Sequence, residues 1–204
     1  VKVGDKLDTG DERYQTEEYI FGTEPNEFIA RIQPYLPTSG RALDLATGEG
    51  RNGIFLARHG LETEGVDLSQ VGLRKAQALA HQYQVPFTTR LANIAEMTMP
   101  TAHYAVITSV FCHFMEPERT QIMQRIVNAL QPGGLFAGVF YHPDQLHYGT
   151  GGPSHVEMLG TLAEMQQALS GLEWLLAEHD VREMNEGSRH VGASSVICLL
   201  GRKP

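Results

Sequence analysis

The stretch Arg41-Ala-Leu-Asp-Leu-Ala-Thr-Gly-Glu-Gly-Arg-Asn-Gly53 combines a short apolar run with three closely spaced glycines. The apolar run predicts a buried strand over residues 42–46, followed by a glycine turn and a helix that begins at Arg51 or Asn52. Glycines at such a turn let backbone N–H groups and the helix N-terminus approach a ligand closely. The order of strand, glycine turn and helix is typical of a nucleotide-binding α/β domain.

Two details of this stretch bear on the ligand. Gly48, Gly50 and Gly53 fit the GxGxxG fingerprint of dinucleotide-binding proteins, a match that discriminates poorly when taken alone. Asp44 places a carboxylate inside the apolar run, directly before the turn. That charge favours a site for a cationic ligand, although a buried carboxylate satisfied by backbone donors is the alternative.

Strand and helix patterns then alternate along the chain with short connections. Strands are predicted at residues 42–46, 62–66, 87–91, 104–108 and 135–141. Five alternations of this kind predict a doubly wound α/β fold with a parallel sheet. Two last strands, at residues 173–182 and 194–200, predict an antiparallel hairpin at a sheet edge, joined by a loop over residues 185–192.

Length, charge and cysteine content restrict the domain organisation and the partners. The 204 residues predict one domain over residues 1–204. A net charge of −8 argues against a nucleic-acid partner, whose binding surface is basic. No apolar run approaches the roughly 20 residues of a membrane span, and two cysteines are too few for a disulfide framework. We therefore expect a cytoplasmic protein without a nucleic-acid or membrane partner; the sequence carries no signal for an oligomeric state.

Ligands of open parallel sheets sit outside the carboxyl ends of the strands. Asp67 follows the second strand, 19 residues after Gly48, where a carboxylate can hold two ribose hydroxyls. Asn93 follows the third strand and offers an amide for an adenine edge, with a turn-forming role as the alternative. The candidate cofactor-binding residues are Asp44, Ala46, Thr47, Gly48, Gly50, Asn52, Asp67, Leu68, Asn93, Ile94 and Ser109.

Taken in order, four motifs resemble those of the class I S-adenosylmethionine-dependent methyltransferases. They are Leu43-Asp-Leu-Ala-Thr-Gly-Glu-Gly-Arg-Asn52, Gly65-Val-Asp67, Ala92-Asn93-Ile94 and Leu130-Gln-Pro-Gly-Gly134. The Gly-Glu-Gly-Arg-Asn form is most similar to the tellurite-resistance branch and related small bacterial methyltransferases. The resemblance covers roughly residues 14–202, and the ordered set is far more specific than any single motif.

The resemblance implies a Rossmann-like sheet of seven strands, with an antiparallel last strand beside the fifth. It implies S-adenosyl-L-methionine as the cofactor and S-adenosyl-L-homocysteine as the product. Asp67 would hold the ribose, Leu68 would flank the adenine, and Ala46 and Gly48 would pass under the methionine part, with Asp44 near its ammonium. Ala46 stands where most members carry a glycine. The turn over residues 21–26 also resembles this branch, so we expect residues 1–36 to form an extension that closes over the cofactor.

Methyl transfer depends mainly on positioning, and it needs a general base only where the acceptor is protonated at neutral pH. Histidines gather in the loops that follow the predicted strands. The candidate wall of the acceptor pocket is His113, Tyr141, His142, His147, His155, Arg189 and His190. Within it we assign catalytic roles to His190, His113, Tyr141 and Arg189. No metal site is expected, because His142 and His147 lack a supporting cysteine or carboxylate spacing.

Thr108-Ser-Val-Phe111 lacks the Asn/Asp-Pro-Pro-Tyr signature of amino-methylating nucleic-acid enzymes, which favours a small-molecule acceptor such as a thiol or a metalloid oxyanion. Two other functions stay open. The GxGxxG match and Asp67 also permit an NAD(P)-dependent oxidoreductase. A non-catalytic S-adenosylmethionine-binding protein would carry the same cofactor motifs.

Overall fold

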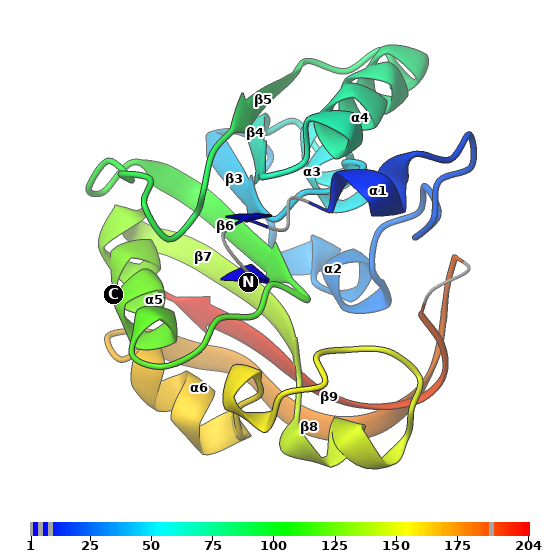
Figure 1. Cartoon of the computed structure of the whole chain (residues 1–204). Coiled ribbons are helices and arrows are strands. Elements are labelled where there is room, and N and C mark those ends of the chain that lie inside the picture. The colour runs from blue at the N-terminus through cyan, green and yellow to red at the C-terminus, as the bar shows by residue number, and fades with distance from the viewer. Residues whose placement is uncertain (1, 4–5, 8–9, 188–189) are drawn as a thin grey trace.

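Seven strands form one mixed sheet in the order β5-β4-β3-β6-β7-β9-β8 (Figure 1). The computed structural model describes residues 2–3, 6–7, 10–187 and 190–204, with side chains for residues 10–187 and 191–204. The strands of this sheet are β3 (Arg41–Leu45), β4 (Glu62–Asp67), β5 (Phe87–Leu91), β6 (Tyr104–Val110), β7 (Leu130–Tyr141), β8 (Glu173–Glu186) and β9 (His190–Arg202). A separate two-stranded sheet joins β1 (Lys2–Val3) to β2 (Lys6–Leu7).

The pairing of the strands confirms the predicted fold class. The first five strands of this sheet, β3 to β7, run parallel to one another. β9 is antiparallel to both β7 and β8. The last strand is therefore inserted between the fifth predicted strand and the sixth, as the family resemblance implied. Strand order changes direction between β3 and β6, and ligands of open α/β sheets bind at such a switch point.

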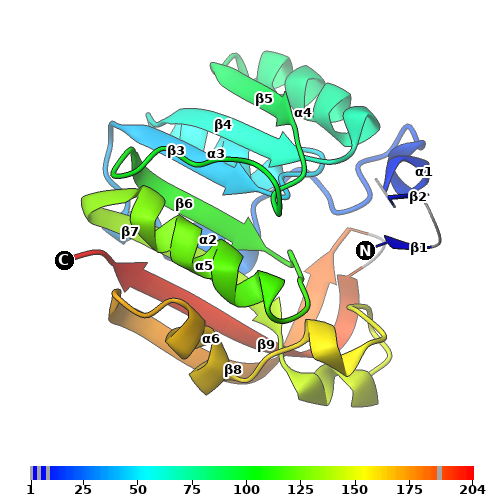
Figure 2. The ribbon, with the colours of Figure 1, turned by 60° about the vertical axis from the view of Figure 1, so that its left-hand side comes forward.

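Helices cover both faces of the sheet (Figure 2). Apolar residues of α5 (Glu118–Ala129) and α6 (Leu162–Ala168) form one core with β3, β7 and β9. α2 (Glu27–Arg31) and α3 (Arg51–Arg58) pack on the opposite face, and α4 (Gln70–Tyr83) packs against α3. The short α1 (Asp11–Tyr14) lies beyond the carboxyl ends of β3 and β4 (Figure 2). Among the described residues there are also three 3-10 helices: η1 (Gln33–Tyr35), η2 (Pro143–His147) and η3 (Val156–Met158).

Two predicted boundaries were wrong. Most of the predicted loop over residues 185–192 is strand, because β8 and β9 stay paired up to Glu186 and His190. The strand predicted at residues 135–141 begins earlier, at Leu130, and the Gly133 N–H donates to the Lys203 carbonyl. α6 begins at Leu162, directly after a reciprocal capping box formed by Thr161 and Glu164.

Candidate functional site

A cavity of about 310 Å³ opens at the carboxyl ends of β3, β4 and β6. This size lies at the lower end of the range for small-molecule sites. Eight of the predicted cofactor residues line it, namely Ala46, Thr47, Gly48, Asn52, Asp67, Leu68, Asn93 and Ile94. The predicted switch-point site is therefore a physical cavity in the structure.

The turn after β3 has the backbone of a glycine turn although its first position is alanine. Ala46 has a φ of 55° and Gly48 a φ of 53°, both in the left-handed region. The turn therefore takes the path that glycine would allow, and Ala46 bears the conformational strain. A Cβ on Gly48 would lie 2.7 Å from the Tyr14 hydroxyl, so a side chain here would displace the Tyr14 ring.

Asp67 lies at the end of β4 with its carboxylate tied to the backbone around it. Its Oδ2 accepts the Gly48 N–H at 2.8 Å, and its Oδ1 accepts the Ser69 N–H at 2.9 Å. A carboxylate has about four acceptor sites, and the N–H groups of Gly48, Ser69 and Leu68 use part of them, so this carboxylate can still accept from a hydroxyl donor. Burial raises the pKa of Asp67, while the N–H groups of Ser69 and Gly48 act in the opposite direction.

Three predicted cofactor residues do not line the cavity. Asp44 is buried in β3, where its oxygens accept the hydroxyls of Thr108 and Thr47 at 2.6 Å each. Burial raises the pKa of Asp44, and the Thr108 and Thr47 hydroxyls lower it. Gly50 makes room for α4, since a Cβ there would lie 2.7 Å from the Ala76 Cβ. Ser109 is buried within β6. A ligand role for these three residues stays a prediction, and Asp44 positions Thr47, which does line the cavity.

One end of the cavity has the composition of a base pocket. Leu68 and Ile94 contribute apolar surface, and Asn93 lies beside them. The Asn93 Oδ1 accepts the Ala95 N–H at 3.1 Å, so this residue also forms the turn after β5. One lone pair of that oxygen remains for an amine donor.

The side chains of the glycine turn hold the N-terminal segment over the cavity. The Glu49 carboxylate accepts the Ile20 N–H at 3.0 Å and pairs with Lys75 at 2.5 Å. Arg51 donates to the Phe21 carbonyl at 3.2 Å, and the Asn52 Oδ1 accepts the Asn26 N–H at 2.8 Å. The Gly-Glu-Gly-Arg-Asn motif therefore fixes residues 20–26 by three separate contacts.

The tip of the β8–β9 hairpin adds further contacts to the N-terminal segment and to Arg51. Glu186 accepts from Arg51 at 2.6 Å and from the Asn26 side chain at 2.6 Å. Gly187 has a φ of 62° and approaches the backbone of Ile20 and Phe21 so closely that a Cβ would overlap it. Three distant parts of the chain thus meet beside the cavity.

Aromatic side chains border the part of the cavity that follows β6. His113 and Phe111 line it, and both rings stack on Tyr141, with centroids 5.6 and 4.5 Å away. Tyr141 itself is buried behind them and does not line the cavity. Cys112 also lines the cavity, and burial followed by the charge of Asp67 raises the pKa of its thiol to about 12. Cys112 is therefore a neutral thiol at physiological pH.

The other predicted acceptor residues lie elsewhere or outside the described part of the chain. Arg189 and the side chain of His190 are outside the described residues, so their roles stay predictions. His147 and His155 are exposed in the segment between β7 and α6. His142 contacts Asp144 and His179 rather than the cavity.

The sequence predicted that residues 1–36 close over the cofactor, but it named no single residue of the cavity roof. Gly10, Arg13, Tyr14 and Phe21 line the cavity, and of these only Phe21 lies in the turn that the sequence singled out. Tyr14 is buried, and its pKa is raised by burial and by the charge of Asp67, so its hydroxyl stays protonated. The resemblance of residues 21–26 to the tellurite-resistance branch was the one signal pointing to this roof.

Comparison with known proteins identifies the central segment. Residues 42–134 match the model of a methyltransferase domain family. An uncharacterized methyltransferase of Synechocystis sp. (sll0829) is 32% identical over 105 residues, which are 50% of this chain and 47% of that protein. The match thus spans about half the length of this relative.

Solved structures share the fold across nearly the whole chain. One comes from work on the conversion of a disulfide bond into a thioacetal group during echinomycin biosynthesis. It has a TM-score of 0.76 at 11% identity and covers 97% of this chain and 92% of its own. TehB from Haemophilus influenzae has a TM-score of 0.69 at 17% identity, covering 97% of this chain and 66% of its own. Residues 42–134 of this chain thus match a methyltransferase domain family, and the chain as a whole shares its fold with these solved structures.

Proposed function

We propose that this protein binds S-adenosylmethionine in the cavity above β3 and β4 and transfers its methyl group to a small-molecule acceptor. The observation that carries the proposal is the position of Asp67. Its carboxylate is fixed by backbone N–H groups, among them those of Gly48 and Ser69, at the edge of the cavity, where it can still accept a hydrogen bond from a ligand hydroxyl. The matched methyltransferase segment contains this whole arrangement.

The lining residues fit the parts of the cofactor. Asp67 would hold the ribose hydroxyls, and Leu68 and Ile94 would enclose the adenine, with Asn93 at its edge. The turn from Ala46 to Gly48 would lie under the amino-acid part, since a bare backbone there leaves room for a close approach. When bound, the cofactor supplies a sulfonium methyl carbon that a nucleophile attacks in line.

The chain itself supplies alignment and exclusion of water. Positioning of two reactants can account for a large part of the rate of such a reaction. We infer that residues 1–36 act as the extension that closes over the cofactor, supported by the contacts of Glu49, Arg51 and Asn52 with residues 20–26. The aromatic border formed by Phe111 and His113 would face the acceptor.

The proposed acceptor is a thiol, a metalloid oxyanion or a similar small molecule. Cys112 does not compete as a nucleophile, because its raised pKa keeps it protonated. His113 is the described titratable side chain of the aromatic border, and it can accept a proton from an acceptor that is not yet ionised. An acceptor that is already an anion at neutral pH would need no general base, only hydrogen bonds and a pocket of matching shape.

An NAD(P)-dependent oxidoreductase is disfavoured by the same turn. A dinucleotide places its pyrophosphate against the N-terminus of the helix after the glycine turn. Here the first turn of α3 is engaged by the N-terminal segment, through Arg51 with Phe21 and Asn52 with Asn26.

Titration calorimetry tests the choice of cofactor. We expect S-adenosylhomocysteine to bind with one-to-one stoichiometry, and NADH and NADPH to give no heat of binding at the same concentrations. Binding of NADH or NADPH without binding of S-adenosylhomocysteine would overturn the proposal. The variant Asp67→Ala serves as the control that any observed binding occurs in this cavity.

Methyl transfer separates an enzyme from a non-catalytic cofactor-binding protein. The purified chain is incubated with methyl-labelled S-adenosylmethionine and separate acceptors: thiols, selenite, tellurite, arsenite and phenols. We expect label in one acceptor class, and loss of that label in Asp67→Ala. Tight binding of S-adenosylhomocysteine with no transfer to any of these acceptors would favour the non-catalytic alternative.

A further inference from the structure

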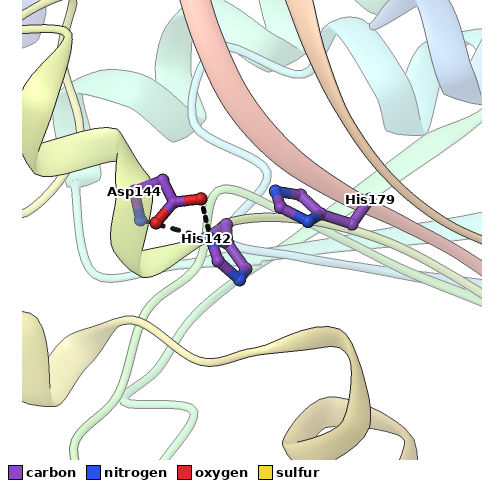
Figure 3. Close-up of side chains that lie close together, drawn as sticks. All are labelled: His142, Asp144 and His179. Atoms are coloured by element: carbon purple, nitrogen blue, oxygen red, sulfur yellow. Dashed lines mark hydrogen bonds and ion pairs between the residues drawn. The ribbon is translucent and has the colours of Figure 1, made fainter.

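Three side chains of metal-ligating type lie together outside the cofactor cavity (Figure 3). His142 directly follows β7, Asp144 belongs to η2, and His179 comes from the middle of β8. One potential ligand atom from each lies within 4.8 Å of the other two. None of the three lines the cavity at the glycine turn, so the cluster is separate from the site described above.

The separation of His142 and Asp144 suits a shared ion, and the His179 ligand atom, which lies within 4.8 Å of both, would move closer when an ion binds. The His142 Nδ1 and the Asp144 Oδ2 are 3.2 Å apart. Two ligand atoms bound at about 2.0–2.2 Å to one tetrahedral or octahedral cation are separated by roughly 3.0–3.5 Å. The rings of His142 and His179 stack with centroids 3.8 Å apart, so the second imidazole is already adjacent.

A buried serine orients the His179 ring and holds the backbone of His142. The His179 Nε2 lies 2.9 Å from the Ser195 hydroxyl, and the His142 backbone N–H donates to the Ser195 carbonyl at 3.0 Å. Ser195 is fully buried, and its own N–H donates to the buried Gln145 side chain at 2.8 Å. Such partners on the far nitrogen of a ligating histidine fix the ring and its tautomer. With Nε2 of His179 bonded to Ser195, its Nδ1 is left for a ligand.

His142 and Asp144 face each other in a way that a cation would satisfy. The His142 Nδ1 also accepts the backbone N–H of Asp144 at 3.2 Å, which requires a lone pair on this nitrogen. The same nitrogen lies 3.2 Å from the Asp144 carboxylate, and either a proton on the imidazole or a cation between the two groups makes this contact favourable. Because the nitrogen has a single lone pair, coordination of a cation through it would replace the hydrogen bond from the Asp144 N–H.

We propose that His142, Asp144 and His179 bind one divalent transition-metal cation of the Zn²⁺ class. Two imidazoles and a carboxylate suit Zn²⁺, Co²⁺ and Ni²⁺, whereas Mg²⁺ and Ca²⁺ prefer oxygen ligands throughout. Asp144 and His179 are exposed, so water can complete the coordination. A bound ion would join the loop after β7 to β8, next to Tyr141 and the aromatic border of the cavity.

Equilibrium dialysis of the tag-free chain against Zn²⁺, with metal analysis of the retained protein, tests this site. We expect one equivalent of bound Zn²⁺, and a dissociation constant at least tenfold weaker in His179→Gln and in Asp144→Asn. His147→Gln is the matched control, because His147 is an exposed histidine of the same 3-10 helix outside the cluster. Mg²⁺ at the same concentration is expected to leave the Zn²⁺ occupancy unchanged.

Circular dichroism of each variant confirms that its fold is intact. Should His179→Gln fail to fold, the exposed Asp144→Asn decides the outcome. The proposal is overturned if the wild-type chain retains less than half an equivalent, or if His147→Gln weakens binding as much as the cluster variants do. The readout is bound metal, so it does not depend on the proposed methyl transfer.

Discussion

The guanidinium of Arg51 lies 2.6 Å from the carboxylate of Glu186 and joins the first turn of α3 to the end of β8. The two residues are 135 positions apart in the sequence. Their side chains are 9% and 10% exposed, so water screens this pair little. Because Arg51 also binds the Phe21 carbonyl, the pair connects the sheet, the hairpin tip and the roof of the cavity.

Replacing Glu186 by glutamine is expected to lower the free energy of unfolding by about 3 kcal/mol, because it leaves the Arg51 charge buried without its partner. Urea denaturation of the purified variant measures this change. Glu178→Gln is the control: Glu178 pairs with Arg31 and Arg182 on the surface, and exposed pairs contribute less than about 1 kcal/mol each. Equal losses in the two variants would contradict a special role for the buried pair.

Asp67→Asn tests the ribose contact with little change of shape. We expect the affinity for S-adenosylhomocysteine to fall roughly 10- to 100-fold, as is typical when a hydrogen bond to a charged group is lost. Calorimetric titration measures the change. Glu64→Gln, on the same strand but outside the cavity, should bind as the wild type does. An unchanged dissociation constant for Asp67→Asn would remove Asp67 from the ribose role.

His113→Ala is expected to reduce the turnover of the acceptor by tenfold or more, because general acid–base catalysis typically contributes about 10²–10⁴ in rate. Its affinity for S-adenosylhomocysteine should change far less, since the ring lies on the aromatic border. We expect the same pattern for His190→Ala from the sequence prediction. His155→Ala, an exposed loop variant, is the control. Loss of cofactor affinity without loss of turnover would exclude His113 from the acceptor side.

The core of the fold was predictable because local patterns repeat along the chain. The apolar strands, the glycine turn and the helix caps each act within a few residues, and together they specified a doubly wound sheet. The cavity lining from Ala46 to Ile94 followed from the same reasoning, since carboxyl ends of parallel strands meet at one edge.

The parts that were missed depend on contacts between distant segments. Tyr14 lines the cavity because Glu49 and Arg51 bind the backbone of Ile20 and Phe21, shortly after it in the chain. No local sequence pattern predicts such a contact. His142 and His179 are 37 positions apart, and they meet because η2 and β8 both lie against β9. From the sequence, His147 was the candidate metal-ligating partner of His142, whereas in the structure Asp144 and His179 lie beside His142.

Ala46→Gly tests the strain in the turn after β3. Alanine in the left-handed region costs about 1–2 kcal/mol, and part of the relief is offset by the greater freedom of glycine in the unfolded chain. We expect a gain of roughly 0.5–1 kcal/mol in the free energy of unfolding, with cofactor affinity retained. Ala78→Gly is the control at an exposed helical position of α4 and should lose about 1 kcal/mol. A loss of stability in Ala46→Gly would show that the methyl group makes a contact that outweighs the strain.

Cys112 provides a pH-dependent probe of the cavity. Its folded-state pKa of about 12 exceeds the ordinary value of 9.0, so the folded thiol keeps its proton as the pH rises through 9, whereas the thiol of the unfolded chain ionises. Alkylation requires the thiolate. At pH 8 we therefore expect labelling of Cys112 by iodoacetamide to be about a thousandfold slower in the folded chain than in urea.

The rate of this reaction should rise about tenfold per pH unit from 8 to 10 without levelling near 9, because the fraction of thiolate grows in proportion to hydroxide below the pKa. Peptide mass spectrometry separates Cys112 from Cys198, whose pKa is also raised, to about 11, by burial. S-Adenosylhomocysteine should slow the labelling of Cys112 further, since this residue lines the cavity. A plateau near pH 9 would show that Cys112 lies in a solvated environment. A labelling rate that S-adenosylhomocysteine does not change would show that Cys112 lies away from the bound cofactor.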